Sequence, residues 1–220
     1  MDKRAFKDKV YTELAKVAKA MANPVRLEII DLLGQGPFTV EQIATHISQS
    51  MANTSQHLQN LKNAKLVQVT KQGNFVLYAL ASSSVYQTWL ALRTLGTEFN
   101  AEVGKVVDDF RQEQHLALPT IHAEQLITML VEEEIILLDV RPEEEFERGH
   151  IQHAISMPVH LLKDALKKFA KKKTIVVYCR GPFCVYADEA VALLHNNGFK
   201  AIRLEEGYPE WEIKGLPIGK

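Results

Sequence analysis

The two cysteines of this chain, Cys179 and Cys184, lie in one short loop and are the residues best suited to chemistry. Cys179 follows a β-branched run at 174–177, and helical periodicity begins at Ala187, shortly after Cys184. A thiol beside the free amides of a helix N-terminus has a lowered pKa, because those amides stabilise the thiolate. The alternative is a pair of inert, buried thiols, since free cysteine often behaves as a small apolar residue. The strand-loop-helix setting favours reactivity, with Cys179 as the nucleophile.

The elements that position this loop follow from the periodicity of the rear half, where predicted helices and strands alternate. The helices are predicted over 122–130, 143–148, 161–169 and 187–196, and the strands over 135–140, 174–178 and 201–204. This alternation is typical of an α/β domain with a parallel sheet. Polar residues 112–115 and then Pro119 mark a linker before it. We therefore predict two domains, 1–111 and 120–220, joined by residues 112–119.

The front half is predicted to be mainly helical. Its helices are predicted over 3–22, 24–33, 40–47 and 51–64, followed by a hairpin over 66–80. Asn23 and Ser50 are residues that cap helix N-termini, and Pro24 suits the first helical position. A last helix over 83–111 is predicted to be interrupted or bent near Gly96 and Gly104.

Composition and charge narrow the class of protein. With 46% hydrophobic and 24% charged residues, the chain has the composition of a globular protein with a substantial core. No apolar run is long enough to span a bilayer or to act as a signal peptide, and two closely spaced cysteines cannot staple a fold of this size, so we expect a cytoplasmic protein without a membrane partner. Residues 1–111 carry 13 Lys and Arg against 10 Asp and Glu, a net of +3, whereas 112–220 carry 13 against 17, a net of −4. A basic front half weakly favours nucleic acid as its partner.

The helices predicted over 40–47 and 51–64 form a helix-turn-helix, and the hairpin after them would supply a wing. Short polar side chains on the second helix suit hydrogen bonding to base edges in a major groove. The residues predicted to contact DNA in this way are Ser50, Asn53, Thr54, Ser55, Gln56 and Gln59. His57, Lys62 and Lys71 are predicted to contact phosphates. The alternative is a helical protein-interaction module, because this helix is polar rather than basic.

Three motifs in the front half resemble the ArsR-type winged-helix repressors. They are Ala22-Asn23-Pro24-Val25-Arg26-Leu27-Glu28-Ile29, then Ser50 with Thr54-Ser55-Gln56-His57-Leu58 and Leu61, and Ala64-Lys65-Leu66-Val67. The resemblance covers about residues 10–80 and implies a homodimer, built from the first and last helices, on a palindromic operator. Many members sense metals through a Cys-x-Cys pair where this chain has Phe38-Thr39-Val40-Glu41, and Asp108 and Asp109 have no nearby histidine except His115. These departures argue against a metal ligand, and nothing else predicts a cofactor.

The rear half resembles the rhodanese family over about residues 120–217. The matching motifs are Asp139-Val140-Arg141-Pro142 with Glu145-Phe146, Gly149-His150-Ile151, Ala154-Ile155 and Pro158, and the closing Gly207-Tyr208-Pro209-Glu210-Trp211. Glu206 departs from this pattern, because a glycine is usual there. The resemblance implies an open α/β domain in which Cys179 accepts sulfane sulfur as a persulfide. Asp139 and Arg141 are interpreted as structural partners that tie the strand to the loop.

The predicted persulfide is an anion that the cysteine loop would surround. Its amides, the helix dipole and the charge of Arg180 would stabilise it. The residues of this loop are Arg180, Gly181, Pro182, Phe183, Cys184 and Val185. Phosphatase or arsenate-reductase chemistry on a related fold would require an arginine at position 185, which is valine here. Cys184 stands where many rhodaneses have an arginine, which disfavours anionic donors such as thiosulfate and adds a second thiol.

Three hypotheses remain open from the sequence. The first is a repressor whose rear domain senses sulfane sulfur or polysulfide, the second a sulfurtransferase tethered to DNA or a partner, and the third a non-catalytic interaction module. For the first, attack of Cys184 on a persulfide at Cys179 would close a disulfide or a longer polysulfide bridge, provided that the loop at Gly181-Pro182 rearranges. The alternative is that Cys184 is a passive residue in the first turn of the helix.

Overall fold

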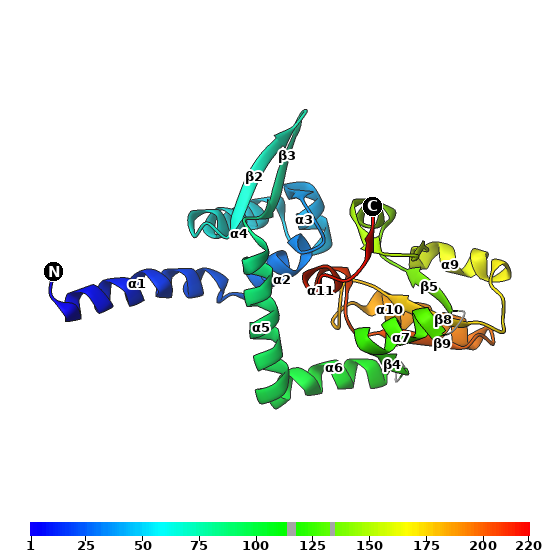
Figure 1. Ribbon diagram of the computed structural model, residues 1–220. Helices are drawn as coiled ribbons and strands as arrows, with labels where there is room; N and C mark the ends of the chain where they lie inside the picture. The colour runs from blue at the N-terminus through cyan, green and yellow to red at the C-terminus, as the bar shows by residue number, and fades with distance from the viewer. Residues whose placement is uncertain (114–117, 133–134) are drawn as a thin grey trace. The chain divides into compact units, whose positions relative to one another are not determined.

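The computed structural model describes residues 1–113, 118–132 and 135–220 (Figure 1). Its internal contacts divide the chain into two compact units, Met1–Leu95 and Gly96–Lys220. The domain limits predicted from the sequence, with a linker at 112–119, stay a prediction. Residues 114–117 of that linker lie outside the described residues.

The first unit begins with four helices that start where the sequence predicted. They are α1 (Lys3–Met21), α2 (Pro24–Leu33), α3 (Val40–His46) and α4 (Met51–Asn63). A side-chain oxygen caps each N-terminus by accepting a backbone N–H that has no partner inside the helix. The capping residues are Asp2, Asn23, Thr39 and Ser50. These local hydrogen bonds explain why the helix starts could be predicted so closely.

A three-stranded antiparallel sheet accompanies the helix-turn-helix formed by α3 and α4. Strands β2 (Val67–Gln72) and β3 (Phe75–Leu80) form the predicted hairpin, and its two-residue turn contains Gly73 at φ +58°. The short strand β1 (Phe38–Thr39), which the sequence did not predict, pairs with β3 and gives the order β1-β3-β2. Ile29, Ile43 and Leu58 lie fully buried in the core of this unit. The front of the chain is therefore a winged helix-turn-helix.

The helix predicted over 83–111 is two helices, α5 (Ser83–Phe99) and α6 (Ala101–Glu113). The predicted interruption is present, but it lies at Asn100, between Gly96 and Gly104, and both glycines lie inside helices. The side chain of Asn100 accepts a hydrogen bond from the Glu102 amide at 3.2 Å, which is how an asparagine starts a new helix. The contacts place α6 in the second unit.

The second unit is built on a five-stranded parallel sheet with the order β4-β9-β8-β5-β7. The predicted strands are β5 (Ile135–Asp139), β8 (Thr174–Tyr178) and β9 (Ala201–Leu204). The structure adds two-residue strands: β4 (Thr120–Ile121), β7 (Ile155–Ser156), and an antiparallel pair of β6 (His150–Ile151) and β10 (Ile218–Gly219). Strands this short carry too little periodicity to be predicted.

Helices cover both faces of this sheet. Side chains of α9 (Val159–Ala165) and α10 (Val185–Asn196) pack on one face, and those of α7 (Ala123–Glu132) and α11 (Tyr208–Ile213) pack on the other. The short helix α8 (Glu143–Arg148) and a 3₁₀ turn at Leu166–Lys168 complete the unit. Along β8 the side chains alternate between the two faces, and Cys179 falls on the face covered by α10. Among the described residues, no helix is both long and apolar enough to cross a membrane.

Candidate functional site

Cys179 lies at the carboxyl end of β8, the middle strand of the sheet, and Cys184 is the last residue before α10. The two sulfurs are joined in a disulfide, with the Cα atoms 6.3 Å apart. This separation lies within the range that a disulfide needs. The sequence predicted that a bridge requires rearrangement at Gly181-Pro182, and in the bridged structure Gly181 has φ +136°, a value suited to glycine. Cys179 is 2% exposed, so its sulfur is shielded in this state.

The amides of the cysteine loop are only partly available to an anion. Pro182 has no N–H group, and the amide of Cys184 donates to the carbonyl of Gly181 at 3.1 Å. Arg180, whose charge the sequence assigned to the anion, donates from Nε to the Glu145 carboxylate at 3.0 Å. Glu145 is 1% exposed and holds that guanidinium. The charge of Arg180 is therefore balanced by a buried carboxylate, which weakens its predicted effect on Cys179.

Asp139 and Arg141 form an ion pair with both side chains fully buried, at 2.6 Å. Arg141 also donates to the backbone carbonyl of Gly149 at 2.8 Å, and its guanidinium lies 4.8 Å from the ring centroid of Tyr208. The pair thus ties the end of β5 to the chain before β6 and to α11. This geometry is compatible with the structural role that the sequence analysis assigned to the pair, and that role stays a prediction.

The closing motif packs directly on the cysteine loop. A Cβ atom at Gly207 would lie 2.2 Å from the carbonyl oxygen of Arg180, so only glycine leaves room for this approach. Glu206, which departs from the usual glycine, accepts the Ala123 amide at 3.0 Å and pairs with Lys214 at 3.0 Å. Its carboxylate thereby satisfies the amide of the first residue of α7. The departure has a structural role of its own.

Two residues that the sequence analysis did not single out, Arg203 and Asp188, also position the cysteine loop. Arg203 on β9 donates from Nη2 to the carbonyls of Gly181 and Pro182, at 3.2 and 3.1 Å. Its Nε lies 3.2 Å from a carboxylate oxygen of Asp188 on α10. Burial raises the pKa of Asp188, and the charges of Arg203 and Arg111 oppose that shift. An arginine inside the buried strand Ala201–Leu204 is the sequence signal that could have found this cluster.

The predicted DNA-contacting residues lie on α4 and on the wing, and most of them are exposed. Ser50 caps α4 through the Asn53 amide at 3.2 Å. The exposed members are Ser50, Asn53, Ser55, Gln56, Gln59, Lys62 and Lys71. Asn53 donates to Gln49 at 2.7 Å and Gln59 donates to Asn63 at 2.7 Å, so these amides are already oriented along the helix surface.

Two members of the predicted DNA-contacting set do not suit their roles. The prediction for Thr54 was wrong: it is fully buried, and its hydroxyl donates to the Ser50 carbonyl at 3.0 Å. Helical spacing places Thr54 on the same inner face as Leu58 and Leu61. His57 is half-buried, and this burial is the main cause that lowers its pKa. The nearby positive charge of Arg26 lowers the pKa further. A neutral imidazole at neutral pH is a poor partner for a phosphate.

Comparisons with known proteins match the two units separately and together. Residues 21–70 match the family described as a helix-turn-helix domain, and residues 122–214 match the rhodanese-like domain. The sulfurtransferase of Allochromatium vinosum is 32% identical over 44% of this chain and 92% of its own length. The transcriptional repressor SdpR of Bacillus subtilis is 39% identical over 29% of this chain and 71% of its own length.

The similarity also extends across both units at once. The HTH-type transcriptional regulator Rv0324 of Mycobacterium tuberculosis is 35% identical over 94% of this chain and 90% of its own length. Among solved structures, the winged helix-turn-helix domain Mb0332 of Mycobacterium bovis is 33% identical, with a TM-score of 0.42 over 46% of this chain and 91% of that one. The chain therefore belongs to the ArsR-type winged helix-turn-helix transcriptional regulators that carry a rhodanese-like domain at their C-terminal end.

Proposed function

We propose that this regulator is a homodimeric repressor that leaves its operator when sulfane sulfur reaches the cysteine loop. The observation that carries the proposal is the bridge between Cys179 and Cys184, with Cα atoms 6.3 Å apart. A rhodanese-like domain needs only one cysteine to accept sulfur. A second cysteine placed to bond with the first gives the domain two chemical states that a regulator can use.

The chemistry begins with a polysulfide as the sulfur donor. The Cys179 thiolate attacks a sulfur of the polysulfide, a sulfur–sulfur bond of the donor breaks, and the shortened polysulfide leaves as an anion. Cys179 then carries a persulfide. The Cys184 thiol gives up its proton, and the resulting thiolate attacks the inner sulfur of the persulfide. The bond to the outer sulfur breaks, and the outer sulfur takes up that proton and leaves as hydrosulfide. Two thiols are oxidised to the disulfide, and one sulfane sulfur is reduced to sulfide.

Operator binding is assigned to α4 and the wing. The exposed amide of Gln56 suits a bidentate contact with a base edge in the major groove, and Lys71 on the wing suits a phosphate. Helix α4 enters this proposal without Thr54, which is buried. SdpR, which is similar to the front of this chain, is named as a transcriptional repressor. This name supports repression, as opposed to activation, as the effect of operator binding.

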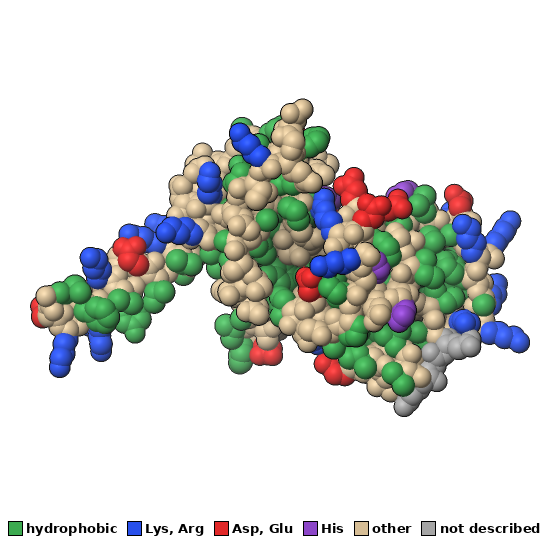
Figure 2. Space-filling view, turned by 45° about the horizontal axis from the view of Figure 1, so that its top comes forward, with side chains coloured by type: hydrophobic (Ala, Val, Ile, Leu, Met, Phe, Trp, Pro, Cys, Tyr) green, Lys and Arg blue, Asp and Glu red, His purple; other side chains and the backbone are tan. Residues whose placement is uncertain are grey.

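The homodimer is supported by the apolar surface of α1. Phe6, Val10, Leu14 and Val17 recur at three- and four-residue spacing, and each is at least 39% exposed. Figure 2 shows hydrophobic side chains gathered along this helix. An exposed stripe of this kind marks a surface that another chain covers. A second copy is the partner we propose, because a two-fold symmetric dimer suits a palindromic operator.

A tethered sulfurtransferase is the second candidate, and the similarity to the Allochromatium vinosum sulfurtransferase over 92% of that protein favours it. Turnover would require an external acceptor to take the outer sulfur of the persulfide before Cys184 attacks. A neighbouring thiol at bonding distance competes with that acceptor. Sulfur transfer to cyanide, measured as thiocyanate, separates the two functions, because a sensor needs only one loading event.

The test is operator binding by the wild type, Cys179→Ser and Cys184→Ser, each with and without polysulfide. Fluorescence anisotropy on an operator fragment gives the affinity, and mass spectrometry gives the sulfur bound to each protein. We expect the wild type to lose about tenfold in affinity, which corresponds to about 1.4 kcal/mol of coupling. Cys179→Ser should bind no sulfur and keep its affinity.

Cys184→Ser decides which sulfur species is the signal. If this variant takes up a persulfide but keeps its operator, the bridge is the signal, as we propose. If it releases DNA as the wild type does, the persulfide alone is the signal. A wild type that binds sulfur without any change in operator affinity would refute the sensor and leave the sulfurtransferase.

A further inference from the structure

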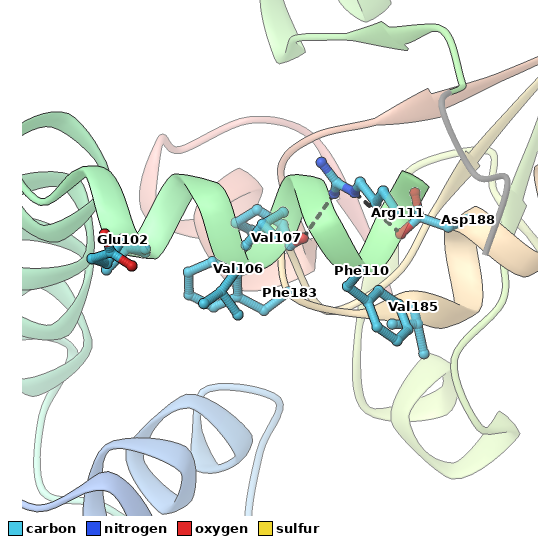
Figure 3. A pocket seen from close by; sticks show the side chains of 10 residues that line it. Glu102, Val106, Val107, Phe110, Arg111, Phe183, Val185 and Asp188 are labelled. Atoms are coloured by element: carbon cyan, nitrogen blue, oxygen red, sulfur yellow. Dashed lines mark hydrogen bonds and ion pairs between the residues drawn. The ribbon is translucent and has the colours of Figure 1, made fainter. Parts of the chain in front are cut away.

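An arginine near the C-terminal end of α6 contacts the cysteine loop. Arg111 donates from Nη2 to the carbonyl of Pro182 at 3.0 Å, and its Nε lies 3.8 Å from a carboxylate oxygen of Asp188 (Figure 3). Pro182 lies between the two bridged cysteines, and Asp188 lies in the first turn of α10. No local pattern singles out Arg111, because its partners lie 71 and 77 positions further along the chain, at 182 and 188.

Arg111 shares both of its partners with Arg203. The two guanidinium groups donate to the same Pro182 carbonyl and flank the same Asp188 carboxylate. They differ in their access to water, because the side chain of Arg203 is 1% exposed and that of Arg111 is 22% exposed. Arg111 can exchange the carbonyl for water at little cost, whereas Arg203 is buried and would lose that hydrogen bond without replacement. Of the two arginines, Arg111 is therefore the one whose hydrogen bond to the loop can break at low cost.

An open pocket lies beside these polar contacts, between α6 and the loop. The volume of this pocket is about 580 Å³, and its walls include Val106 and Phe110 of α6 and Phe183 of the loop. Figure 3 shows these side chains around the cavity with Arg111 at one end. Because this space is open to solvent, the helix and the loop are not closely packed along it. The polar contacts of Arg111 are therefore among the contacts that hold α6 against the loop.

We propose that Arg111 is the positioning residue that couples the redox state of the cysteine pair to α6. This inference rests on the proposed function, since it supplies the link from the sulfur chemistry to the helix that follows α5. Closing the bridge fixes the ends of the segment 179–184 at a Cα separation of 6.3 Å, and the carbonyl that Arg111 binds lies inside that segment. Opening the bridge removes this covalent constraint, so the position of the Pro182 carbonyl then depends on hydrogen bonds alone. Helix α6 is therefore held more firmly in the bridged state than in the reduced state.

Hydrogen exchange on the full-length protein tests this coupling without a sulfur donor or DNA. Exchange of the α6 amides, followed by mass spectrometry of peptides over 101–113, is compared after oxidation with diamide and after reduction with dithiothreitol. In the wild type we expect α6 to exchange about five- to tenfold more slowly when the bridge is closed, at the lower end of typical coupling factors. In Arg111→Ala this difference should fall below about twofold.

Two further variants keep the result interpretable. Arg111→Lys retains the charge beside Asp188 but loses the planar guanidinium, so it should restore part of the exchange difference between the two redox states. Such a partial difference also shows that the domain folds when residue 111 is not arginine. Lys105→Ala changes an exposed cation on the same helix and should keep the full difference. Equal exchange in both redox states of the wild type would overturn the coupling, as would an Arg111→Ala protein that keeps the full difference.

The same variants separate this inference from the proposed function. Arg111→Ala should still form the Cys179–Cys184 bridge with polysulfide but should lose most of the tenfold change in operator affinity. If the wild type ignores polysulfide while α6 still responds to diamide, the sensor is wrong and the coupling stands. If Arg111→Ala releases DNA as fully as the wild type, the coupling is wrong and the sensor stands.

Discussion

Replacing Gly207 with alanine should push the cysteine loop out of place. The backbone of Gly207 has φ −91° and ψ 177°, which alanine adopts freely, so the effect comes from space rather than from backbone strain. A Cβ at this position would lie 2.2 Å from the Arg180 oxygen, 2.3 Å from the Arg180 carbonyl carbon and 2.7 Å from the Gly181 nitrogen. All three are backbone atoms of the loop and cannot swing aside as the end of a side chain can.

The size of the effect follows from these distances. Cβ contacts below 3.0 Å are essentially never found, so the loop and Gly207 must separate by at least about 0.8 Å, the difference between 3.0 and 2.2. Helix α11 is fixed by Trp211, which is 1% exposed and donates to the Pro217 carbonyl at 2.8 Å. The loop therefore moves, and overpacking of this kind costs about 1–3 kcal/mol. We expect Gly207→Ala to lower the unfolding free energy of the second unit by that amount.

The assay is urea unfolding followed by the fluorescence of Trp211. The chain has two tryptophans, so a Trp89→Phe background leaves Trp211 as the only reporter. Gly104→Ala is the matched control, since a Cβ there meets nothing within 4 Å, and alanine in a helix interior should add about 0.5–1 kcal/mol. Unchanged stability in Gly207→Ala, or an equal loss in Gly104→Ala, would refute the steric argument. The variant should also form the Cys179–Cys184 bridge more slowly with diamide.

Two other predictions concern the DNA surface and the buried carboxylate. Gln56→Ala should cost about 1–3 kcal/mol of specific operator binding, whereas Lys71→Ala should weaken all sequences alike and reduce the salt dependence, both measured by anisotropy titrations at several salt concentrations. Equal losses on specific and random DNA in Gln56→Ala would contradict base contact. The raised pKa of Asp188 means that the native state binds its proton more tightly than the unfolded state, so stability contributed by this group is present below pH 3.8 and is lost as pH rises through the folded pKa. Asp188→Asn should flatten that part of the stability profile, and Arg111→Ala should extend it to higher pH; a profile unchanged by Asp188→Asn would contradict the assignment.

The predictions from sequence succeeded where local signals decide the structure. Asn23 and Ser50 cap their helices through hydrogen bonds to amides three residues ahead, and the β-branched run before Cys179 is a buried strand. The break between α5 and α6 was expected near Gly96 and Gly104 and lies at Asn100 between them, because glycine inside a helix is tolerated. The capping tendency of Asn100 was the better signal.

The candidate site was predicted only in part, because some of its contacts join distant segments. Cys179 and Cys184 share one loop and could be found together, but Arg203 and Arg111 reach that loop from 21 and 71 positions away, through the Pro182 carbonyl. Thr54 was assigned to DNA from its polarity alone. Its helical phase, shared with Leu58 and Leu61, already places it inside.

The short spacing of the cysteines has a consequence for folding. The bridge joins residues five positions apart, so it closes a ring of only six residues in the unfolded chain. Loop-closure entropy gives such a small ring about 2 kcal/mol of stabilisation, compared with about 3 kcal/mol for a ring of about 15 residues. The bond therefore stabilises the domain less than a bridge across a longer loop would, and the packed core supplies the remaining stability, so the bond can form and break within one native structure. Reductants should turn over the bridge without exposing the core to proteases.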